Sequence, residues 1–339
     1  MTFTDYLNMI IKRQDLSNDQ MTDMLSDIFS GTITEAQIGA FMAALAVKGE
    51  TFEELAGAAR AMRAKAARIQ TVSKKAVDTC GTGGDSSGSF NISTTTAFVV
   101  AGCGVTVAKH GNRSISSKCG SADVLEALGV NINTHPEVVE EAVNEIGIGF
   151  LFAPLFHSAM RHVAKARKDV GIRSIFNMLG PLTNPAAARC QLLGVFAPQL
   201  TEMFAQALKL LGTHHAFVVH GHDGMDEITV CAPTRISELK DGQIRSYDLD
   251  PLDFFDDYAD PAELKGGDAA TNAAITTAIL KGVHGAQRNI VLINSAAALV
   301  AADAALNLED GIKKATASID SGKAMEKLEQ LAKFTQENA

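Results

Sequence analysis

The 339-residue sequence contains no tryptophan, only three tyrosines and only five cysteines. The cysteines are odd in number, widely separated and never arranged as Cys-x-x-Cys, which argues against a disulfide framework and against a zinc site. No run of 18 apolar residues is present, and no basic segment leads into an apolar run at the N-terminus. We therefore expect no membrane span and no signal peptide, but a soluble cytoplasmic protein with reduced thiols. These thiols are Cys80, Cys103, Cys119, Cys190 and Cys231.

The sequence also lacks an excess of basic residues. Its net charge is −9, from 30 Lys and Arg against 39 Asp and Glu. This balance argues against a nucleic-acid-binding protein that relies on a broad basic face, but not against a small anionic ligand held by a few local cations. Hydrophobic residues (46%) and charged residues (20%) stand in ordinary globular proportions, and the length is sufficient for two domains.

Residues 3–69 have the pattern of four helices. Gly31 and Gly49 stand where C-terminal caps are expected. We predict a small all-helical N-terminal domain over residues 1–70, with a hinge near residues 70–75. The stretch 156–188 fits a strand–helix alternation poorly, and we expect part of it to join the helical domain. Three of the helix starts show capping-box pairs, namely Ser17 with Gln20, Thr34 with Gln37 and Thr51 with Glu54.

From residue 71 to residue 339, short apolar runs alternate with helical segments. This alternation is typical of βαβ units, so we predict a larger α/β domain with a mostly parallel central sheet. The turn Lys240-Asp-Gly-Gln243 predicts a hairpin within residues 236–249. Strands are expected at residues 105–108, 148–152, 192–196, 216–220 and 289–293. Helices are expected at residues 93–102, 121–128, 136–145, 198–211 and 268–281, with others near the C-terminus.

Glycine is concentrated between residues 77 and 129, which hold nine of the 28 glycines. Gly81-Thr-Gly-Gly-Asp85 follows a short strand and precedes a hydroxyl-rich helix start, where backbone amides can wrap a pyrophosphate. A plain flexible turn is the alternative. Asn91 or Ser93 is expected to cap the helix. The loop is not a Rossmann fingerprint, since Ser86 replaces the third glycine, and no Gly-Lys-Ser/Thr follows to make it a Walker A loop.

The same loop contains a second pattern, because Gly84-Asp-Ser86-Ser-Gly88 matches the G-x-S-x-G of a nucleophile elbow. An elbow needs a sharp strand-to-helix turn centred on the serine. Here three glycines separate the strand from Ser86, and no His-Gly-Gly segment precedes it. We therefore expect no hydrolase nucleophile at this position.

Two further polar segments follow predicted strands. Lys109-His-Gly-Asn-Arg-Ser-Ile-Ser-Ser117 comes after the strand at residues 105–108, and ligands gather at the carboxyl ends of such strands. Asp226-Glu227 follows the strand that ends at His220, and paired carboxylates near a phosphate site suggest Mg²⁺, with a solvated acidic turn as the alternative. His220 and His222 lack a third zinc ligand at a recognised spacing, so we expect structural roles for both.

The motifs occur together in one order that identifies a family. They are Gly-Thr-Gly-Gly-Asp, Phe-Asn-Ile-Ser-Thr, Lys-His-Gly-Asn-Arg-Ser-x-Ser-Ser-Lys-x-Gly-Ser-Ala-Asp, Gly-Ile-Arg-Ser-Ile-Phe-Asn-x-Leu-Gly-Pro-Leu-Thr-Asn-Pro and Asp-Glu. With the helices before them, they make the whole chain resemble the anthranilate phosphoribosyltransferases of tryptophan biosynthesis.

The resemblance implies transfer of the phosphoribosyl group of 5-phosphoribosyl 1-pyrophosphate (PRPP) to the amino group of anthranilate. The products would be N-(5-phosphoribosyl)anthranilate and pyrophosphate. The resemblance also implies substrate binding between the two domains, a homodimer that associates through the helical domains, and Mg²⁺ as cofactor, expected at two ions per subunit. We expect no nucleophile or base, because the aniline nitrogen is largely unprotonated and the leaving group needs electrostatic stabilisation.

The family's site residues carry over to matching positions of this sequence. PRPP would be bound by Gly81, Gly84, Asp85, Ser89, Asn91, Ile92, Ser93, Thr94, Lys109, His110, Gly111, Asn112, Arg113, Ser114, Ile115, Ser116, Ser117 and Ser121. Anthranilate would be bound by Gly81, His110, Asn112, Arg167, Gly180 and Pro181. The metal would be held by Ser93, Asp226 and Glu227.

Two other functions remain open from the sequence. A pyrimidine nucleoside phosphorylase has a related fold, but it would use a Lys-His-Ser type motif for phosphate, where this chain has Lys109-His110-Gly111. A non-enzymatic relative that binds nucleic acid would need a basic groove, which the net charge of −9 does not favour.

Overall fold

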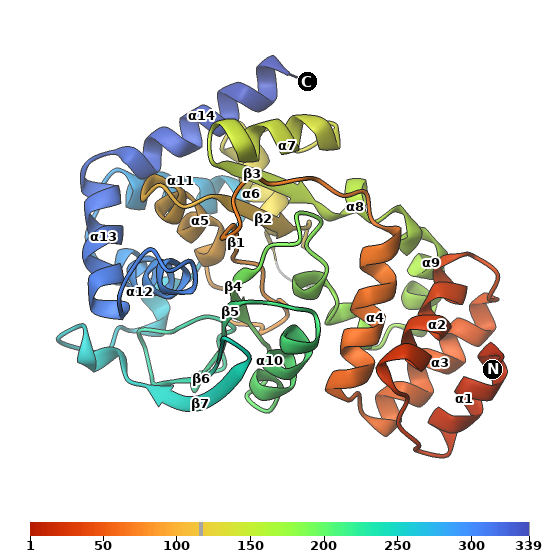
Figure 1. Cartoon of the computed structure of the whole chain (residues 1–339). Coiled ribbons are helices and arrows are strands. Elements are labelled where there is room, and N and C mark those ends of the chain that lie inside the picture. The colour runs from red at the N-terminus through yellow and green to blue at the C-terminus, as the bar shows by residue number, and fades with distance from the viewer. Residues whose placement is uncertain (115–117, 339) are drawn as a thin grey trace.

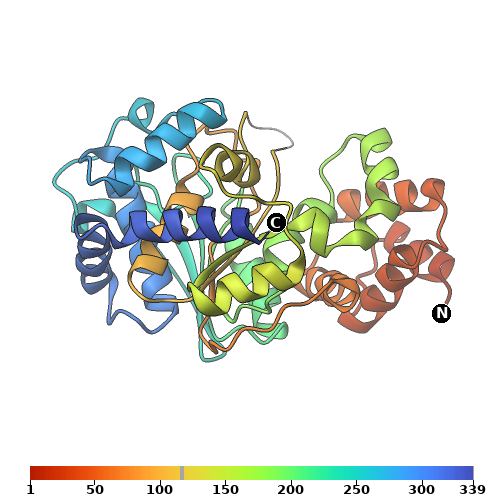
Figure 2. The ribbon, with the colours of Figure 1, turned by 90° about the horizontal axis from the view of Figure 1, so that it is seen from above.

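The computed structural model describes residues 1–114 and 118–338. A group of helices from the N-terminal part of the chain lies at one side of an α/β body, and the two views show the same separation (Figures 1 and 2). None of the helices in the described ranges combines the length and apolarity needed to cross a membrane. The N-terminal helices are α1 (Phe3–Ile11), α2 (Asn18–Phe29), α3 (Glu35–Lys48) and α4 (Phe52–Lys65).

The predicted capping boxes start three of these helices. Ser17, Thr34 and Thr51 each accept a hydrogen bond from the backbone three residues later, and the side chain of that later residue bonds back. Each pair satisfies two backbone amides that have no partner within the helix, so the helix starts are defined locally. Gly31 and Gly49 follow with positive φ, as C-terminal caps do. The four predicted helices are confirmed.

A seven-stranded sheet forms the centre of the α/β body, in the order β3-β2-β1-β4-β5-β6-β7. The first five strands are parallel and the last two form an antiparallel hairpin at one edge, so the mostly parallel sheet and the hairpin are both confirmed. The strands are β1 (Val77–Asp78), β2 (Val107–Gly111), β3 (Ile148–Phe152), β4 (Cys190–Gly194), β5 (His215–Gly221), β6 (Thr234–Lys240) and β7 (Gln243–Leu249).

Helices cover both faces of this sheet. The helices of the body are α5 (Ile92–Gly102), α6 (Ser121–Ala127), α7 (Pro136–Glu145), α10 (Leu200–Leu210), α11 (Ala269–Leu280), α12 (Ala286–Ala301), α13 (Leu308–Asp320) and α14 (Lys323–Glu337). Alternate residues of a strand face opposite ways. Leu192 of β4 therefore packs in the cluster with α5 and α12, while Leu193 packs with α10 and the N-terminal helices.

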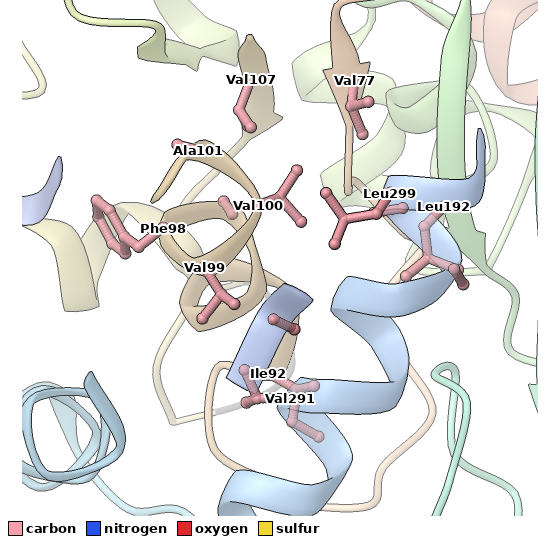
Figure 3. Close-up of a cluster of buried hydrophobic side chains, with 14 of the residues drawn as sticks. Val77, Ile92, Phe98, Val99, Val100, Ala101, Val107, Leu192, Val291 and Leu299 are labelled. Carbon is pink, nitrogen blue, oxygen red and sulfur yellow. The ribbon is translucent and has the colours of Figure 1, made fainter. Parts of the chain in front are cut away.

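The main core lies between the sheet and helices α5 and α12. Figure 3 shows Val100 of α5 and Leu299 of α12 facing each other next to Val77 of β1. All three side chains are fully buried, and burial of a side chain of this size contributes roughly 1.5–3 kcal/mol. This packing fixes α5 against β1 and α12, and α5 begins at the end of the loop that follows β1.

The strand predicted at residues 289–293 is wrong, because these residues belong to α12. Every residue from Ile290 to Ala301 is buried, so the helix is buried on all sides and lacks the exposed polar face that would mark it as a helix in the sequence. The run Ile-Val-Leu-Ile is also rich in β-branched residues, which favour strands. Two other strands are displaced from their predicted bounds: β2 extends to Gly111, and β4 starts at Cys190.

The chain leaves the body after β3 and packs on the N-terminal helices. This excursion contains α8 (Ala153–Phe156), α9 (Arg161–Val170) and three short 3-10 turns, Ser158–Met160, Ile175–Asn177 and Gly180–Leu182. Phe176 contacts Phe29 and Phe41 edge to face, with ring centroids 6.3 Å apart in both pairs. Residues of this stretch therefore pack against α2 and α3.

Candidate active site

The glycine-rich loop after β1 packs directly on the end of β4. The Thr82 amide donates to the Gly194 carbonyl at 2.8 Å. A Cβ atom on Gly81 would lie 3.0 Å from the same carbonyl oxygen, and a Cβ on Gly194 would lie 1.5 Å from the Asp226 carbonyl oxygen. The loops after β1 and β5 therefore meet over the end of β4, at a distance that only glycine allows.

Three carboxyl groups gather where these loops meet. The Asp226 amide donates to Asp85 at 3.3 Å, and the Ser93 amide hydrogen-bonds the Glu227 carboxyl. Burial, reinforced by the charge of Asp85, raises the pKa of Asp226 to about 8. Burial and then the charge of Asp226 raise the pKa of Glu227. The structure thus brings the predicted metal residues Ser93, Asp226 and Glu227 together, beside Asp85.

Lys109 supplies the nearest buried cation. Its ammonium group donates to the Thr79 hydroxyl at 3.2 Å and to the Ser93 hydroxyl at 3.3 Å, and the side chain is 4% exposed. The sequence placed Lys109 just after a strand, whereas it lies within β2, opposite Phe150 of β3. The hydrogen bond to Ser93 places the ammonium group at the amino end of α5, where backbone amides also favour an anion.

The remaining residues predicted on the β1–α5 loop have mixed environments. Asn91 stands at the start of α5, but its side chain bonds Cys119 and Asn272 instead of the helix amides, so the expected side-chain cap is wrong. Ile92 is a core residue and offers only its backbone. The Thr94 hydroxyl is buried and has no partner among the described residues. The Ser89 hydroxyl accepts a hydrogen bond from the Ser87 hydroxyl at 3.1 Å, and the backbone of Ser89 forms an isolated antiparallel β-bridge with Lys265.

In the loop between β2 and α6, the side chain of Arg113 is held by acidic residues of α6. The Arg113 guanidinium pairs with Asp123 at 2.9 Å and with Glu126 at 2.6 Å, both on α6. Asn112 is exposed, and its carbonyl accepts from the Ser121 hydroxyl at 3.2 Å.

The other members of this predicted set lie close to the same loop. A Cβ on Gly111 would lie 2.3 Å from the Ser121 hydroxyl, so the end of β2 and the start of α6 are in contact. The Ser114 amide donates to Asp123 at 3.3 Å. Ile115, Ser116 and Ser117 lie outside the described residues.

A second cluster brings His110, Gly180 and Pro181 together. His110 Nδ1 lies 2.9 Å from the Gly180 carbonyl, and Gln191 donates to the Pro181 carbonyl at 2.7 Å. Asn184, four residues after Gly180, donates to the Ala108 carbonyl at 2.8 Å and to Asp78 at 2.7 Å. The 3-10 turn at Gly180 is therefore anchored to β2.

Arg167 lies on α9, a different segment of the chain from those that hold His110 and Gly180. Its guanidinium stands over the Phe176 ring, 5.9 Å from the centroid, and burial lowers its pKa. Within residues 1–114 and 118–338 it has no carboxylate partner. A half-buried guanidinium without an anion is suited to a carboxylate ligand.

Several residues at this edge of the sheet were not predicted. Gly194 was missed because its role is a close backbone approach, which no sequence pattern marks. Arg173 donates to the Gly84 carbonyl at 2.9 Å while stacked 3.8 Å from the Phe196 centroid. Asn294 of α12 bonds both backbone groups of Ile228, next to Glu227. Of these three residues, only Arg173 lies in a motif recognised from the sequence, Gly-Ile-Arg-Ser.

The structure also resolves the other sequence patterns. Ser86 has φ of 61°, but the helix does not start until Ile92, so the nucleophile elbow is absent from this loop. His220 bonds the Val195 carbonyl at 2.7 Å and His222 lies 3.3 Å from Asp248, which confirms structural contacts for both. No disulfide joins any two cysteines in the described part of the chain.

Comparisons with known proteins agree with this geometry. The model of the glycosyl transferase family, a/b domain, matches residues 73–325, and that of the helical bundle domain of the same family matches residues 4–66. An anthranilate phosphoribosyltransferase from Desulfosudis oleivorans is 66% identical over 337 residues, which cover 99% of each chain. One from Alkaliphilus metalliredigens is 51% identical over 98% of each chain.

Solved structures show the same similarity. The crystal structure of anthranilate phosphoribosyltransferase from Thermus thermophilus superposes with a TM-score of 0.93 at 40% identity, covering 98% of this chain and 99% of that one. The Saccharomyces cerevisiae enzyme in complex with PRPP and Mg superposes with a TM-score of 0.90 at 27% identity, covering 99% and 98%. The relatives favour phosphoribosyl transfer over nucleoside phosphorolysis and over a nucleic-acid-binding role. The chain belongs to the anthranilate phosphoribosyltransferase family.

Proposed function

We propose how the residues at the carboxyl edge of the sheet divide the reaction of this family among them. The chain transfers the phosphoribosyl group of PRPP to the amino group of anthranilate, giving N-(5-phosphoribosyl)anthranilate and pyrophosphate, a step of tryptophan biosynthesis. The observation that carries this function is the 66% identity over 99% of the chain to a protein of that name. The roles of single residues are our assignment.

The first role is to hold PRPP. We assign the pyrophosphate to the loop Gly81–Asp85, to residues 89–94 and to Lys109, because backbone amides and a buried cation meet there. The phosphoribosyl half is assigned to residues 109–117 and to Ser121. Arg113 can reach the ligand only by leaving its ion pairs on α6. In the yeast relative, PRPP is a bound ligand, which supports a site of this kind.

The second role is to hold magnesium. Asp226 and Glu227 have raised pKa values because burial disfavours their charged forms, as does the negative charge of Asp85 beside Asp226 and of Asp226 beside Glu227. A cation that replaces the protons removes this penalty, so the oxygen donors Ser93, Asp226 and Glu227 fit Mg²⁺. Bound Mg²⁺ supplies positive charge that stabilises the departing pyrophosphate. We propose two ions per subunit, and a calorimetric titration that gives one ion would overturn this number.

The third role is to hold anthranilate. We assign its carboxylate to Arg167, which has no other anion in the described structure, and the pocket wall to Gly81, His110, Asn112, Gly180 and Pro181. A relative from yeast is known in complex with 4-fluoroanthranilate, an analogue of this substrate. We assign no nucleophile and no general base, since an aniline nitrogen attacks without deprotonation. Alignment of two bound substrates then supplies most of the rate.

We also propose the domain division and the assembly. Residues 1–70 with part of 156–188 form the helical domain, residues 71–339 form the α/β domain, and residues near 70–75 form the hinge. A homodimer through the helical domains is supported by Ile11 and Val47 on α1 and α3, which are 60% and 73% exposed. Val47→Glu should convert the dimer to a monomer in light scattering, and an unchanged mass would refute this interface. A cytoplasmic location is supported by the thiols, which form no disulfide in the described chain.

The function is tested by following anthranilate fluorescence after addition of PRPP and Mg²⁺ to the purified protein. The fluorescence should decrease as the amine is consumed, and pyrophosphate should appear in equal amount. Folded protein that gives no decrease would refute the function. Uridine and thymidine with phosphate, tested in parallel, should give no phosphorolysis.

A further inference from the structure

Two buried histidines are in contact beside Gly180. His110 and His157 are 2% and 4% exposed, and their rings meet edge to face with centroids 5.1 Å apart. His110 Nδ1 lies 2.9 Å from the Gly180 carbonyl, and His110 Nε2 lies 3.2 Å from His157 Nε2. The three residues come from β2, from the segment after β3 and from the 3-10 turn before β4. A relay of hydrogen bonds therefore joins three distant parts of the chain.

The proton positions in this relay follow from its partners. A carbonyl oxygen can only accept, so His110 must carry its proton on Nδ1. Burial lowers the pKa of His110 to about 4 and that of His157 to about 3, so both rings are neutral near pH 7. His110 Nε2 is then a bare acceptor, and the proton between the rings belongs to His157 Nε2. His157 Nδ1 is left as a buried acceptor with no partner among the described residues.

We propose that His157 is a positioning residue for the anthranilate pocket, which holds His110 in the tautomer that binds the Gly180 carbonyl. The proposal rests on the function proposed above, since His110 and Gly180 are assigned to that pocket there. The Gly180 carbonyl and the His157 donor both favour the proton on His110 Nδ1, so loss of the donor weakens this preference and lets a fraction of His110 place its proton on Nε2. Its bare Nδ1 would then face the Gly180 carbonyl, and two acceptors at hydrogen-bond distance repel each other.

His157 also lies at a point where it affects the carboxylate-binding arginine. It stands between α8 and the 3-10 turn Ser158–Met160, which leads directly into α9 and Arg167. The contact with His110 thus ties the start of the segment that carries Arg167 to the end of β2. A buried acceptor without a partner costs free energy, and each such group in a folded protein needs an explanation. His157 Nδ1 is a group of this kind.

The test compares two substitutions of His157. Gln places an amide donor close to the position of Nε2, whereas Phe keeps the ring but has no donor. His157→Phe should raise the KM for anthranilate about tenfold, the effect of losing about one hydrogen bond, with the KM for PRPP changed less than about twofold. His157→Gln should restore most of the loss.

A matched control is available at the opposite edge of the sheet. His215 is also fully buried, and it too has a bare Nδ1 without a partner in the described chain, with Nε2 2.8 Å from Glu238. His215→Phe should lower stability but leave both KM values unchanged. Equal rises of both KM values in His157→Phe, or the same anthranilate effect in His215→Phe, would overturn the proposal as general loss of structure.

A second measurement needs no activity. In ¹⁵N-histidine-labelled protein, His110 should show a protonated Nδ1 and an unprotonated Nε2, and His157→Phe should give a mixture of tautomers. A protonated Nε2 on His110 in the unsubstituted protein would overturn the proposal even if the variants fail to fold. Absence of turnover with the expected NMR signals would instead refute the proposed function and leave the relay intact.

Discussion

The two sides of the proposed cleft are held in different ways. The pyrophosphate side is formed by closely packed backbone groups. Gly81 packs against the Gly194 carbonyl and Gly194 against the Asp226 carbonyl, so neither glycine has space for a Cβ atom. This side also contains three carboxyl groups. The anthranilate side is formed by a directional relay of neutral histidines centred on His110, together with Arg167, which has no carboxylate partner in the described part of the chain.

Because of this difference, we expect the two sides to respond differently to substitution. A surface built from close backbone contacts is sensitive to volume, because added atoms must displace a loop. A relay of side chains is sensitive to the position of protons and tolerates a change of volume that keeps the donor.

The largest effect is expected for Gly194→Ala. Its Cβ would lie 1.5 Å from the Asp226 carbonyl, so the metal-binding loop must move. A displacement of about 1 Å at a catalytic group costs roughly 100-fold in rate, and we expect a loss of kcat/KM of at least this size with a higher Mg²⁺ requirement. Initial rates over a Mg²⁺ titration measure both.

The matched control for this substitution is Gly39→Ala in α3. Its Cβ would meet only a Val170 methyl group at 3.3 Å, and alanine favours a helix. The control should keep full activity. A Gly194→Ala enzyme with normal Mg²⁺ dependence would show that the loops after β1, β4 and β5 are not coupled.

A smaller effect is expected for Arg167→Ala. A hydrogen bond to a charged group contributes roughly 1.5–3 kcal/mol, so the KM for anthranilate should rise about 10- to 150-fold while PRPP binding changes little. Steady-state kinetics with each substrate varied in turn separate the two. Lys168→Ala, next in sequence and exposed, is the control. If PRPP binding alone suffered, the assignment of Arg167 would be wrong.

The histidine relay predicts the pH dependence of stability. The pKa of His110 falls from 6.5 to about 4 on folding and that of His157 to about 3, so between these values and 6.5 the unfolded state binds more protons. The contribution of this pair to the free energy of unfolding should therefore fall on acidification below pH 6.5, by up to about 1.4 kcal/mol per pH unit for each histidine. The raised pKa of Asp226 acts in the opposite direction over the same range, so urea unfolding at pH 7, 6 and 5 compares the unsubstituted protein with His157→Gln. The unsubstituted protein should lose more stability on acidification than the variant, or gain less, and identical slopes would contradict the neutral pair.

The smallest effect is expected for Arg173→Gln, at the contact between the two sides. The glutamine amide can keep the bond to the Gly84 carbonyl but lacks the charge and the stacking on Phe196. An exposed cation–π contact is weak, so the KM for PRPP should rise about threefold. Arg161→Gln, an exposed arginine at the start of α9, should change nothing measurable. A larger effect on anthranilate than on PRPP would place Arg173 on the other side of the cleft.

Local signals account for what could be predicted of the fold. The capping boxes at Ser17, Thr34 and Thr51 and the turn at Asp241-Gly242 act between neighbouring residues, so they are visible in sequence and were confirmed. The helix at Ala286–Ala301 was taken for a strand because it is buried on all sides, and burial by distant elements leaves no periodic pattern. The Asn91 cap failed for the same reason, since Asn272, 181 residues away, takes its side chain.

By itself, the sequence determined the family, the α/β class with its helical N-terminal part, and the polar segments that meet at the carboxyl edge of the sheet. Motifs and local caps depend on residues close together in the chain, so they can be recognised from the sequence alone. Only the tertiary structure decided that Gly194 must be glycine, that Arg113 is paired on α6 and that His157 contacts His110. These roles depend on distances between segments far apart in the chain, and chain folding alone sets such distances.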